Sequence, residues 1–184
     1  MRVILLLFLI VVEAVMARPA QVILLRHAEK PEEVWDPHLS PRGEERARAL
    51  VSFFTNTPAL TGNGLPVALF AARPKGHGGG GRTGETLEPL AKQLNLPVQT
   101  PYYSTDYASL VKAIMNRGEY DGKTVVVCWV HTALPDLAKE FGVKSAPVRW
   151  KDEVFDRAWI IRFTDKKAKL TEIPQKLLPG DRSR

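Results

Sequence analysis

Three short apolar runs constrain the fold of this chain more than any other feature of its sequence. They read QVILL at 21–25, LPVALFAA at 65–72 and KTVVVCW at 123–129. None of them alternates polar and apolar side chains, which indicates strands that are covered on both faces. Strands of this kind occur in parallel sheets that carry helices on each side. The sequence therefore predicts an α/β protein.

Helical patterns separate these strands. Ser40-Pro41 combines a capping residue with a first-turn proline, and apolar residues recur at helical spacing over 42–54. The other expected elements are helices at 83–94, at 104–117 and from Pro135 to before Gly142, a turn-rich segment at 56–66, and two final strands at 157–163 and 169–173. The alternation predicts a mostly parallel sheet with helices on both faces. The chain of 184 residues corresponds to about one domain.

The first 17 residues have the pattern of a secretory signal. A positively charged start precedes an apolar run from Val3 to Val12, and small residues lead to a cleavage site expected after Ala17. The apolar run is shorter than the ~18 residues that argue for a membrane-spanning helix. We therefore expect residues 1–17 to be removed and 18–184 to form a periplasmic or secreted domain with no stable membrane span. If translation starts at Met16, the protein is instead cytoplasmic.

Charge and cysteine content narrow the classes of partner. Lys and Arg number 26 against 20 Asp and Glu, and the net charge of +6 suits anionic partners such as phosphates, nucleic acid or a membrane surface. Aromatic residues do not interleave the basic ones as they do in single-strand nucleic-acid sites, so we expect no nucleic-acid partner. The single Cys128 excludes an internal disulfide and a multi-cysteine metal site. Four histidines leave imidazole chemistry open.

Two of these histidines follow apolar strands directly. His27 comes after the strand at 21–25 and His131 after the strand at 123–129. Because ligands bind at the carboxyl ends of strands in open parallel sheets, both side chains should face one crevice. Arg26 precedes His27, and Arg82 lies at a glycine-rich helix start, where a phosphate is also favoured. Two arginines and two imidazoles at one sheet edge predict a pocket for a phosphoryl group.

In these segments the chain resembles the histidine phosphatase, or phosphoglycerate mutase-like, superfamily. Four motifs show the resemblance, in the order that the family has them: LLRHAEK at 24–30, LSPRGEERARAL at 39–50, GRTGETLEPLA at 81–91 and VVVCWVHTALPDLAKEFG at 125–142. They span most of the chain. The Arg-His pair alone is a moderately specific signal, whereas the ordered set is a strong one.

The resemblance implies a three-layer α/β/α sandwich and phosphoryl transfer through a phosphohistidine. It implies that His27 is the nucleophile, that Arg26 and Arg82 bind the phosphate, and that His131 is the second pocket histidine. We expect a hydrolase of phosphate monoesters rather than a mutase, acting on a phosphorylated small molecule or a phosphoprotein. The scheme requires neither a metal ion nor another cofactor.

The general acid is the part that the sequence identifies least well. In the acid phosphatase and phytase branch an Asp directly follows the second histidine, but this chain has Thr132 there. The mutase-like branch supplies a carboxylate after the Arg-x-x-Glu-Thr helix, and Asp106 is the acidic residue of that segment. Asp106 is therefore the candidate acid, with Glu85 and Glu29 as weaker candidates.

Two other functions stay open. The chain could be a catalytically silent phosphate-binding protein of the same fold, because sites can be retained for binding alone. Gly76 to Thr83, which reads GHGGGGRT, also fits a nucleotide-binding P-loop except that Arg82 replaces the lysine. A P-loop protein needs a magnesium-binding Asp after another strand. Val130 and His131 stand at that place here, which argues against this alternative.

Overall fold

The computed structural model of the chain describes residues 18–33, 36–74, 81–164 and 167–182. The expected signal at 1–17 and residues 76–80 of the glycine-rich segment lie outside this part. Within the described residues, every helix is too short or too polar to cross a membrane.

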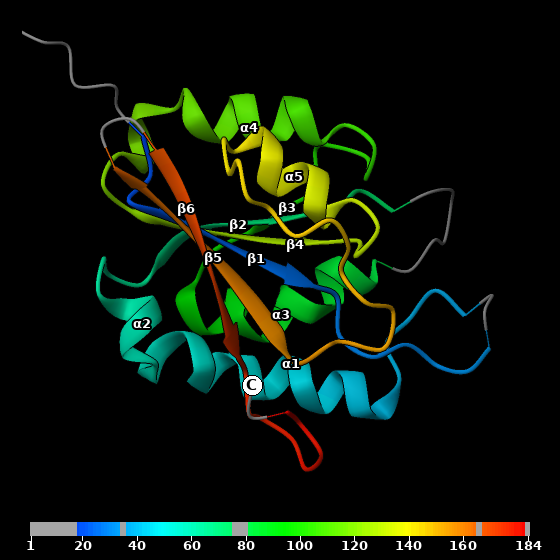
Figure 1. The fold of residues 1–184 in the computed structure, drawn as a ribbon. Coiled ribbons are helices and arrows are strands. Elements are labelled where there is room, and N and C mark those ends of the chain that lie inside the picture. Colours follow the sequence, from blue (N-terminus) through cyan, green and yellow to red (C-terminus); the bar gives the residue numbers. More distant parts are fainter. Residues whose placement is uncertain (1–17, 34–35, 75–80, 165–166, 183–184) are drawn as a thin grey trace, which may run out of the picture.

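A six-stranded sheet with the order β3-β2-β4-β1-β5-β6 forms the centre of the structure (Figure 1). Its strands are β1 (Gln21–Arg26), β2 (Pro66–Ala71), β3 (Val98–Gln99), β4 (Thr124–Trp129), β5 (Arg157–Thr164) and β6 (Lys167–Pro174). The first four in this spatial order pair in parallel, whereas β5 runs antiparallel to β1 and β6 antiparallel to β5. The sheet is thus mostly parallel with an antiparallel edge.

Helices cover both faces of this sheet. They are α1 (Pro41–Asn56), α2 (Pro58–Thr61), α3 (Arg82–Leu94), α4 (Tyr107–Met115), a 3₁₀ turn at Gly118–Tyr120 and α5 (Leu134–Glu140). Figure 1 shows α1, α2 and α3 on one face and α4 and α5 on the other. The three-layer α/β/α sandwich that the sequence analysis expected is confirmed.

The central strands are apolar on both sides because each side packs against a helical layer. In β1, Val22 and Leu24 pack with the α4 and α5 layer, while Ile23 and Leu25 pack with the α1 and α3 layer. All of them are fully buried. Cys128 and Trp129 in β4 also belong to the core, as their place in an apolar run predicted.

Three segments differ from the sequence-based expectation. The two residues of β3 pair with Leu69 and Phe70, which is too short a strand for any periodicity to reveal. Part of the turn-rich segment forms the single helical turn α2. Helix α4 begins at Tyr107 rather than at Ser104, because residues before it form a turn in which the backbone N–H of Tyr103 donates to the Asp106 carboxylate.

Helix α1 begins against the segment that follows β1. The Ser40 side chain caps the helix by accepting from the backbone N–H of Gly43, and the Ser40 N–H donates to the Glu29 carbonyl. A Cβ atom added to Gly43 would lie 2.2 Å from that same carbonyl oxygen. Gly43 thus lets α1 approach the backbone two residues beyond His27.

We predict that Gly43→Ala destabilises the protein by roughly 1–3 kcal/mol, because the methyl group collides with backbone atoms that have no flexible side chain to move. Gly84→Ala is the matched control: it lies in α3, where a Cβ meets nothing within 4 Å. A helical alanine there should stabilise by up to about 1 kcal/mol. Urea unfolding of the two variants measures both effects. Equal stability of the two variants would contradict the close approach at Gly43.

Candidate active site

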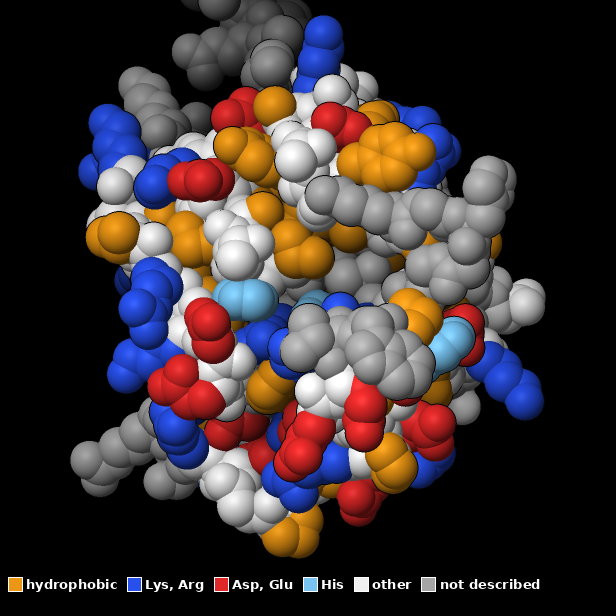
Figure 2. Space-filling model, turned by 90° about the vertical axis from the view of Figure 1, so that its right-hand side faces the viewer, with side chains coloured by type: hydrophobic (Ala, Val, Ile, Leu, Met, Phe, Trp, Pro, Cys, Tyr) orange, Lys and Arg blue, Asp and Glu red, His pale blue; other side chains and the backbone are white. Residues whose placement is uncertain are grey.

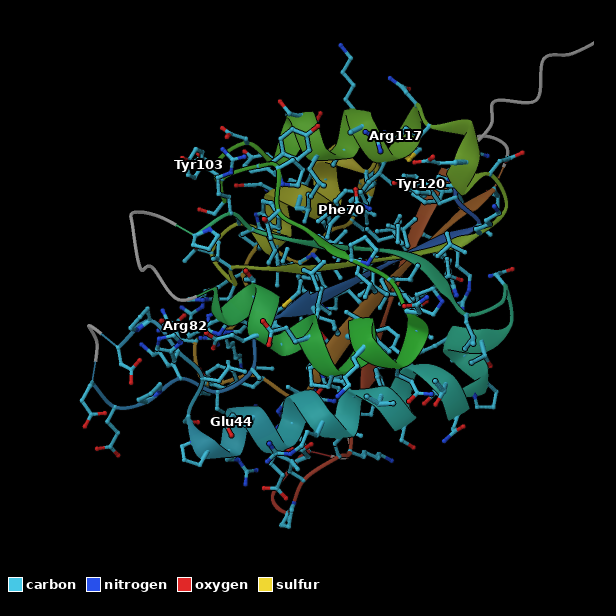
Figure 3. The ribbon with its side chains drawn as sticks, turned by 180° about the vertical axis from the view of Figure 1, so that it is seen from behind. Glu44, Phe70, Arg82, Tyr103, Arg117 and Tyr120 are labelled. Atoms are coloured by element: carbon cyan, nitrogen blue, oxygen red, sulfur yellow. The ribbon has the colours of Figure 1, made fainter. Side chains whose placement is uncertain are left out.

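The two histidines lie beyond the carboxyl ends of two neighbouring parallel strands. β1 and β4 pair so that Arg26, the last residue of β1, is opposite Trp129, the last residue of β4. His27 and His131 follow at the same edge of the sheet. Arg82, the first residue of α3, lies close enough for its charge to act on Arg26 and His27. Figure 3 shows it on the same side of the molecule as Tyr103. The structure therefore brings together the four residues that the sequence singled out.

This edge is also visible on the molecular surface. Figure 2 shows histidine side chains and cationic side chains near the middle of this face, with acidic side chains gathered in the lower half. Cations and imidazoles thus occupy the centre of the face, beside a more acidic border.

Arg26 is held by a loop that sequence reasoning did not identify. Its side chain is buried, and Nη1 donates to the backbone carbonyls of Lys151, Asp152 and Val154. The guanidinium also stacks on the Phe155 ring, with Cζ 3.9 Å from the ring centroid. Burial lowers the pKa of Arg26 to about 10, although Asp152 and Glu29 raise it. At neutral pH Arg26 therefore remains a cation.

His27 is buried, with 6% of its surface exposed. Its Nδ1 lies 2.8 Å from the Ala28 carbonyl oxygen. Because a carbonyl only accepts, Nδ1 bears the proton and Nε2 presents the lone pair. Burial above all, together with the charges of Arg26 and Arg82, lowers the pKa of His27 to about 4, although the hydrogen bond to Ala28 raises it. His27 is therefore a neutral imidazole with a defined tautomer, which is the form that a nucleophile requires.

His131 is half-buried. Its Nε2 lies 3.4 Å from the Asp152 carboxylate. Burial lowers the pKa of His131, and the charges of Arg26 and Lys30 act in the same direction, whereas Asp152 raises it. Its Nδ1 is buried and has no hydrogen-bond partner among the described residues.

Helix α3 is tied to the histidine segment by hydrogen bonds at its start. Arg82 donates to the Asp36 carbonyl at 2.6 Å. The buried Thr86 hydroxyl accepts from the backbone N–H of Ala28 at 2.9 Å and donates to the Arg82 carbonyl at 2.6 Å. Thr86 thus fixes the position of α3 relative to the residue after His27. The Arg-x-x-Glu-Thr pattern could have suggested this role, because a buried hydroxyl needs hydrogen-bond partners.

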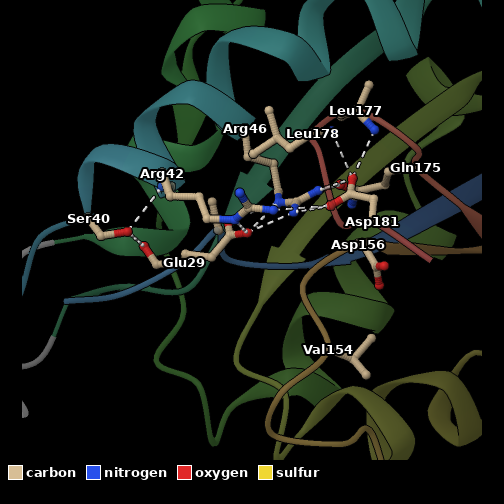
Figure 4. Close-up of polar contacts among 12 residues, drawn as sticks. Glu29, Ser40, Arg42, Arg46, Val154, Asp156, Gln175, Leu177, Leu178 and Asp181 are labelled. Atoms are coloured by element: carbon tan, nitrogen blue, oxygen red, sulfur yellow. Dashed lines mark hydrogen bonds and ion pairs between the residues drawn. The ribbon is translucent and has the colours of Figure 1, made fainter. Parts of the chain in front are cut away.

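A buried ion network supports the pocket from the α1 side (Figure 4). The Arg46 side chain is 3% exposed and forms ion pairs with Glu29 and Asp181, each at 2.7 Å. Burial raises the pKa of Asp181, but the hydrogen bonds from Arg46 and from two backbone N–H groups lower it to about 2. The C-terminal segment is thereby joined to Glu29, two residues after His27.

The three candidate acids of the sequence analysis have other partners. Glu29 binds Arg46, and the Glu85 carboxylate binds His38 Nδ1 at 2.6 Å and the backbone N–H of Leu39. Asp106 is exposed, and its carboxylate accepts from groups of its own turn. That turn lies at the same edge of the sheet, since the Trp129 indole donates to the Ser104 carbonyl. The described residues show no hydrogen bond or ion pair between Asp106 and the four pocket side chains.

Comparison with solved structures finds this architecture in several proteins, among them two from bacteria. One, provisionally assigned as the phosphohistidine phosphatase SixA from Agrobacterium tumefaciens, is 16% identical, with a TM-score of 0.53 over 83% of this chain and 96% of its own. The other, provisionally assigned as an α-ribazole-5′-P phosphatase from Escherichia coli, is 14% identical, with a TM-score of 0.58 over 88% of this chain and 98% of its own. The chain has the histidine phosphatase fold.

The histidine phosphatase fold agrees with the resemblance that the four ordered motifs indicated. No family model matches the chain, and comparison with curated proteins finds no match. The similarity is therefore detected in the arrangement of elements rather than in overall sequence. Among the described residues, His, Cys, Asp and Glu form no cluster of three or more that could hold a metal ion.

Two histidines have surroundings that shift their pKa values in opposite directions, and this leads to a prediction for their titration. His27 should titrate near pH 4, whereas exposed His38 should titrate above the ordinary value because the Glu85 carboxylate raises its pKa. Ring resonances in an NMR pH titration, assigned with His38→Gln, measure both midpoints. In the unfolded chain His27 is protonated below about pH 6.5, whereas in the folded protein it stays neutral down to about pH 4. The contribution of the neutral ring to the free energy of unfolding should therefore be lost as pH falls from about 6.5 to 4. A His27 midpoint at or above that of His38 would show that the pocket does not keep this ring neutral.

Proposed function

We propose that the protein is a phosphatase that hydrolyses phosphate monoesters through a phosphohistidine on His27. Arg26, Arg82 and His131 bind the phosphoryl group in this scheme. The substrate is a phosphorylated small molecule or a phosphoprotein; one structural neighbour is named for phosphohistidine and the other for α-ribazole-5′-P. Export through the 1–17 leader is part of the proposal and places the activity outside the cytoplasm.

The observation that most supports this function is a pair of unpartnered nitrogens beside His27. Among the described residues, three buried polar side-chain atoms lack a hydrogen-bond partner, and two of them are Arg26 Nε and His131 Nδ1. Leaving such a group unpaired costs about 1–3 kcal/mol. Arg26 Nε–H needs an acceptor, and a phosphoryl oxygen supplies one. His131 Nδ1 becomes a donor when the ring is protonated, a form that a neighbouring phosphoryl dianion favours.

The charges also suit the transition state of phosphoryl transfer. Negative charge spreads over the equatorial oxygens of the transferred group, so fixed cations contribute much of the catalysis. The Arg26 guanidinium is fixed by backbone carbonyls and by Phe155, and Arg82 is fixed by Asp36. Among the described residues, no side chain caps the first turn of α3, which leaves backbone N–H groups that favour an anion.

The nucleophile is tested by assaying the purified protein on 4-nitrophenyl phosphate beside His27→Ala. We expect His27→Ala to lower kcat by more than about 1000-fold, because removal of a nucleophile abolishes the covalent route. Wild type should also yield a trapped phosphoenzyme that is stable to base and labile to acid, as a phosphohistidine is, and that is absent from the variant. His38→Gln, which changes an exposed histidine, should retain wild-type turnover.

Each other outcome selects a different function. Full activity in His27→Ala would exclude His27 as the nucleophile. A wild type that binds inorganic phosphate but turns over no ester would indicate the silent phosphate-binding protein. Nucleotide binding that depends on Arg82 but not on His27 would indicate the P-loop alternative.

A further inference from the structure

One exposed carboxylate lies beside His131. Asp152 Oδ1 is 3.4 Å from His131 Nε2, and the Asp152 side chain is 80% exposed. The backbone carbonyl of the same residue accepts a hydrogen bond from Arg26 Nη1. Arg26 thus fixes the backbone of Asp152, while the Asp152 carboxylate remains accessible from solvent.

Asp152 is distinguished from the other carboxylates near the pocket by its partners. Glu29 binds Arg46, Glu85 binds His38, and Asp106 binds the backbone of its own turn. Among the described residues, Asp152 is the only Asp or Glu whose carboxylate forms an ion pair or hydrogen bond with one of the four pocket side chains. Its charge also acts on both Arg26 and His131.

We propose that Asp152 is the general acid that protonates the leaving oxygen of the substrate. The inference rests on the proposed phosphatase function and replaces Asp106 as the candidate for this role. An acid must lie beyond the phosphoryl group from the nucleophile, on the side from which the alcohol leaves. The Asp152 carboxylate is exposed and lies next to His131, whereas His27 is buried, so Asp152 can approach the leaving oxygen from the solvent side.

The two chemical steps then balance with the residues of this chain and one water molecule. In the first, the His27 Nε2 lone pair forms a bond to phosphorus, the ester P–O bond breaks, and the leaving oxygen takes the Asp152 proton. In the second, water attacks phosphorus, Asp152 takes a proton from that water, and the N–P bond electrons return to His27. Inorganic phosphate leaves, and the carboxyl group is protonated again.

The experiment compares two esters whose leaving groups differ in their need for a proton. 4-Nitrophenyl phosphate releases an acidic phenol, whereas benzyl phosphate releases an aliphatic alcohol on a similar ring. The full-length protein is assayed as wild type, Asp152→Asn and Glu153→Gln. Glu153→Gln removes the same charge at the next residue, which also acts on Arg26, and is the matched control. We measure kcat/KM, because it reports the steps up to the phosphoenzyme, where the leaving group departs.

We expect Asp152→Asn to lower kcat/KM roughly 100-fold or more for benzyl phosphate, the range of general acid catalysis, and less than about 5-fold for 4-nitrophenyl phosphate. Glu153→Gln should change neither value by more than about 2-fold, since surface pairs contribute little. Equal losses on both esters would mean that Asp152 only positions His131 and would overturn the proposal. The proposal would also be overturned if Asp152→Asn lost activity on neither ester. The same holds if Asp106→Asn, rather than Asp152→Asn, lost activity on benzyl phosphate but not on 4-nitrophenyl phosphate.

Failure of this inference is distinguishable from failure of the phosphatase function. If wild type hydrolyses an ester, His27→Ala does not, and Asp152→Asn retains the benzyl phosphate rate, the phosphatase stands and Asp152 is excluded as the acid. If wild type hydrolyses neither ester, the phosphatase function and the role of Asp152 are both refuted.

Discussion

The buried guanidinium of Arg26 is the interaction on which the site depends. A cation at the end of an apolar strand loses the solvation of water, and removing it from water costs several kcal/mol unless other groups replace it. The carbonyls of 151–154 and the Phe155 ring supply part of that replacement. Their contacts fix the loop before β5 over the end of β1. Arg26 therefore positions the backbone of Asp152 beside the proposed site.

The neighbouring histidine is affected by the same cation. Burial lowers the pKa of His27, and the positive charges of Arg26 and Arg82 favour its neutral form further. The proposed nucleophile and the proposed phosphate-binding cations are thus compatible, because cations that would attract a phosphate also discourage protonation of the His27 ring. The Ala28 carbonyl then determines which nitrogen bears the proton.

A second constraint holds the segment after His27 in place. Glu29 is fixed by Arg46, which also binds Asp181 near the C-terminus, and Gly43 lets α1 meet the Glu29 backbone. On the α3 side the Thr86 hydroxyl binds the N–H of Ala28. Residues distant in sequence therefore fix the backbone on both sides of the short segment that bears His27.

The fold and the central residues could be predicted from the sequence because local patterns determine them. Doubly apolar strands require two helical layers, and parallel strands bring Arg26, His27 and His131 to one edge. The partners of Arg26 could not be predicted, since backbone carbonyls of 151–154 carry no signature of residue type. Asp152 was missed for the same reason: its relation to His131 arises from the loop path. The short strand β3 has too few residues to show a period.

A crystal structure of the protein with orthovanadate tests the central claim most directly, since vanadate adopts the trigonal bipyramid of the phosphoryl transfer transition state. The account predicts vanadium bonded to His27 Nε2 at an apical position, with Arg26, Arg82 and His131 bound to the equatorial oxygens and Asp152 near the opposite apical oxygen. Vanadate bound away from His27, or held in the pocket without contact to its ring, would contradict the account.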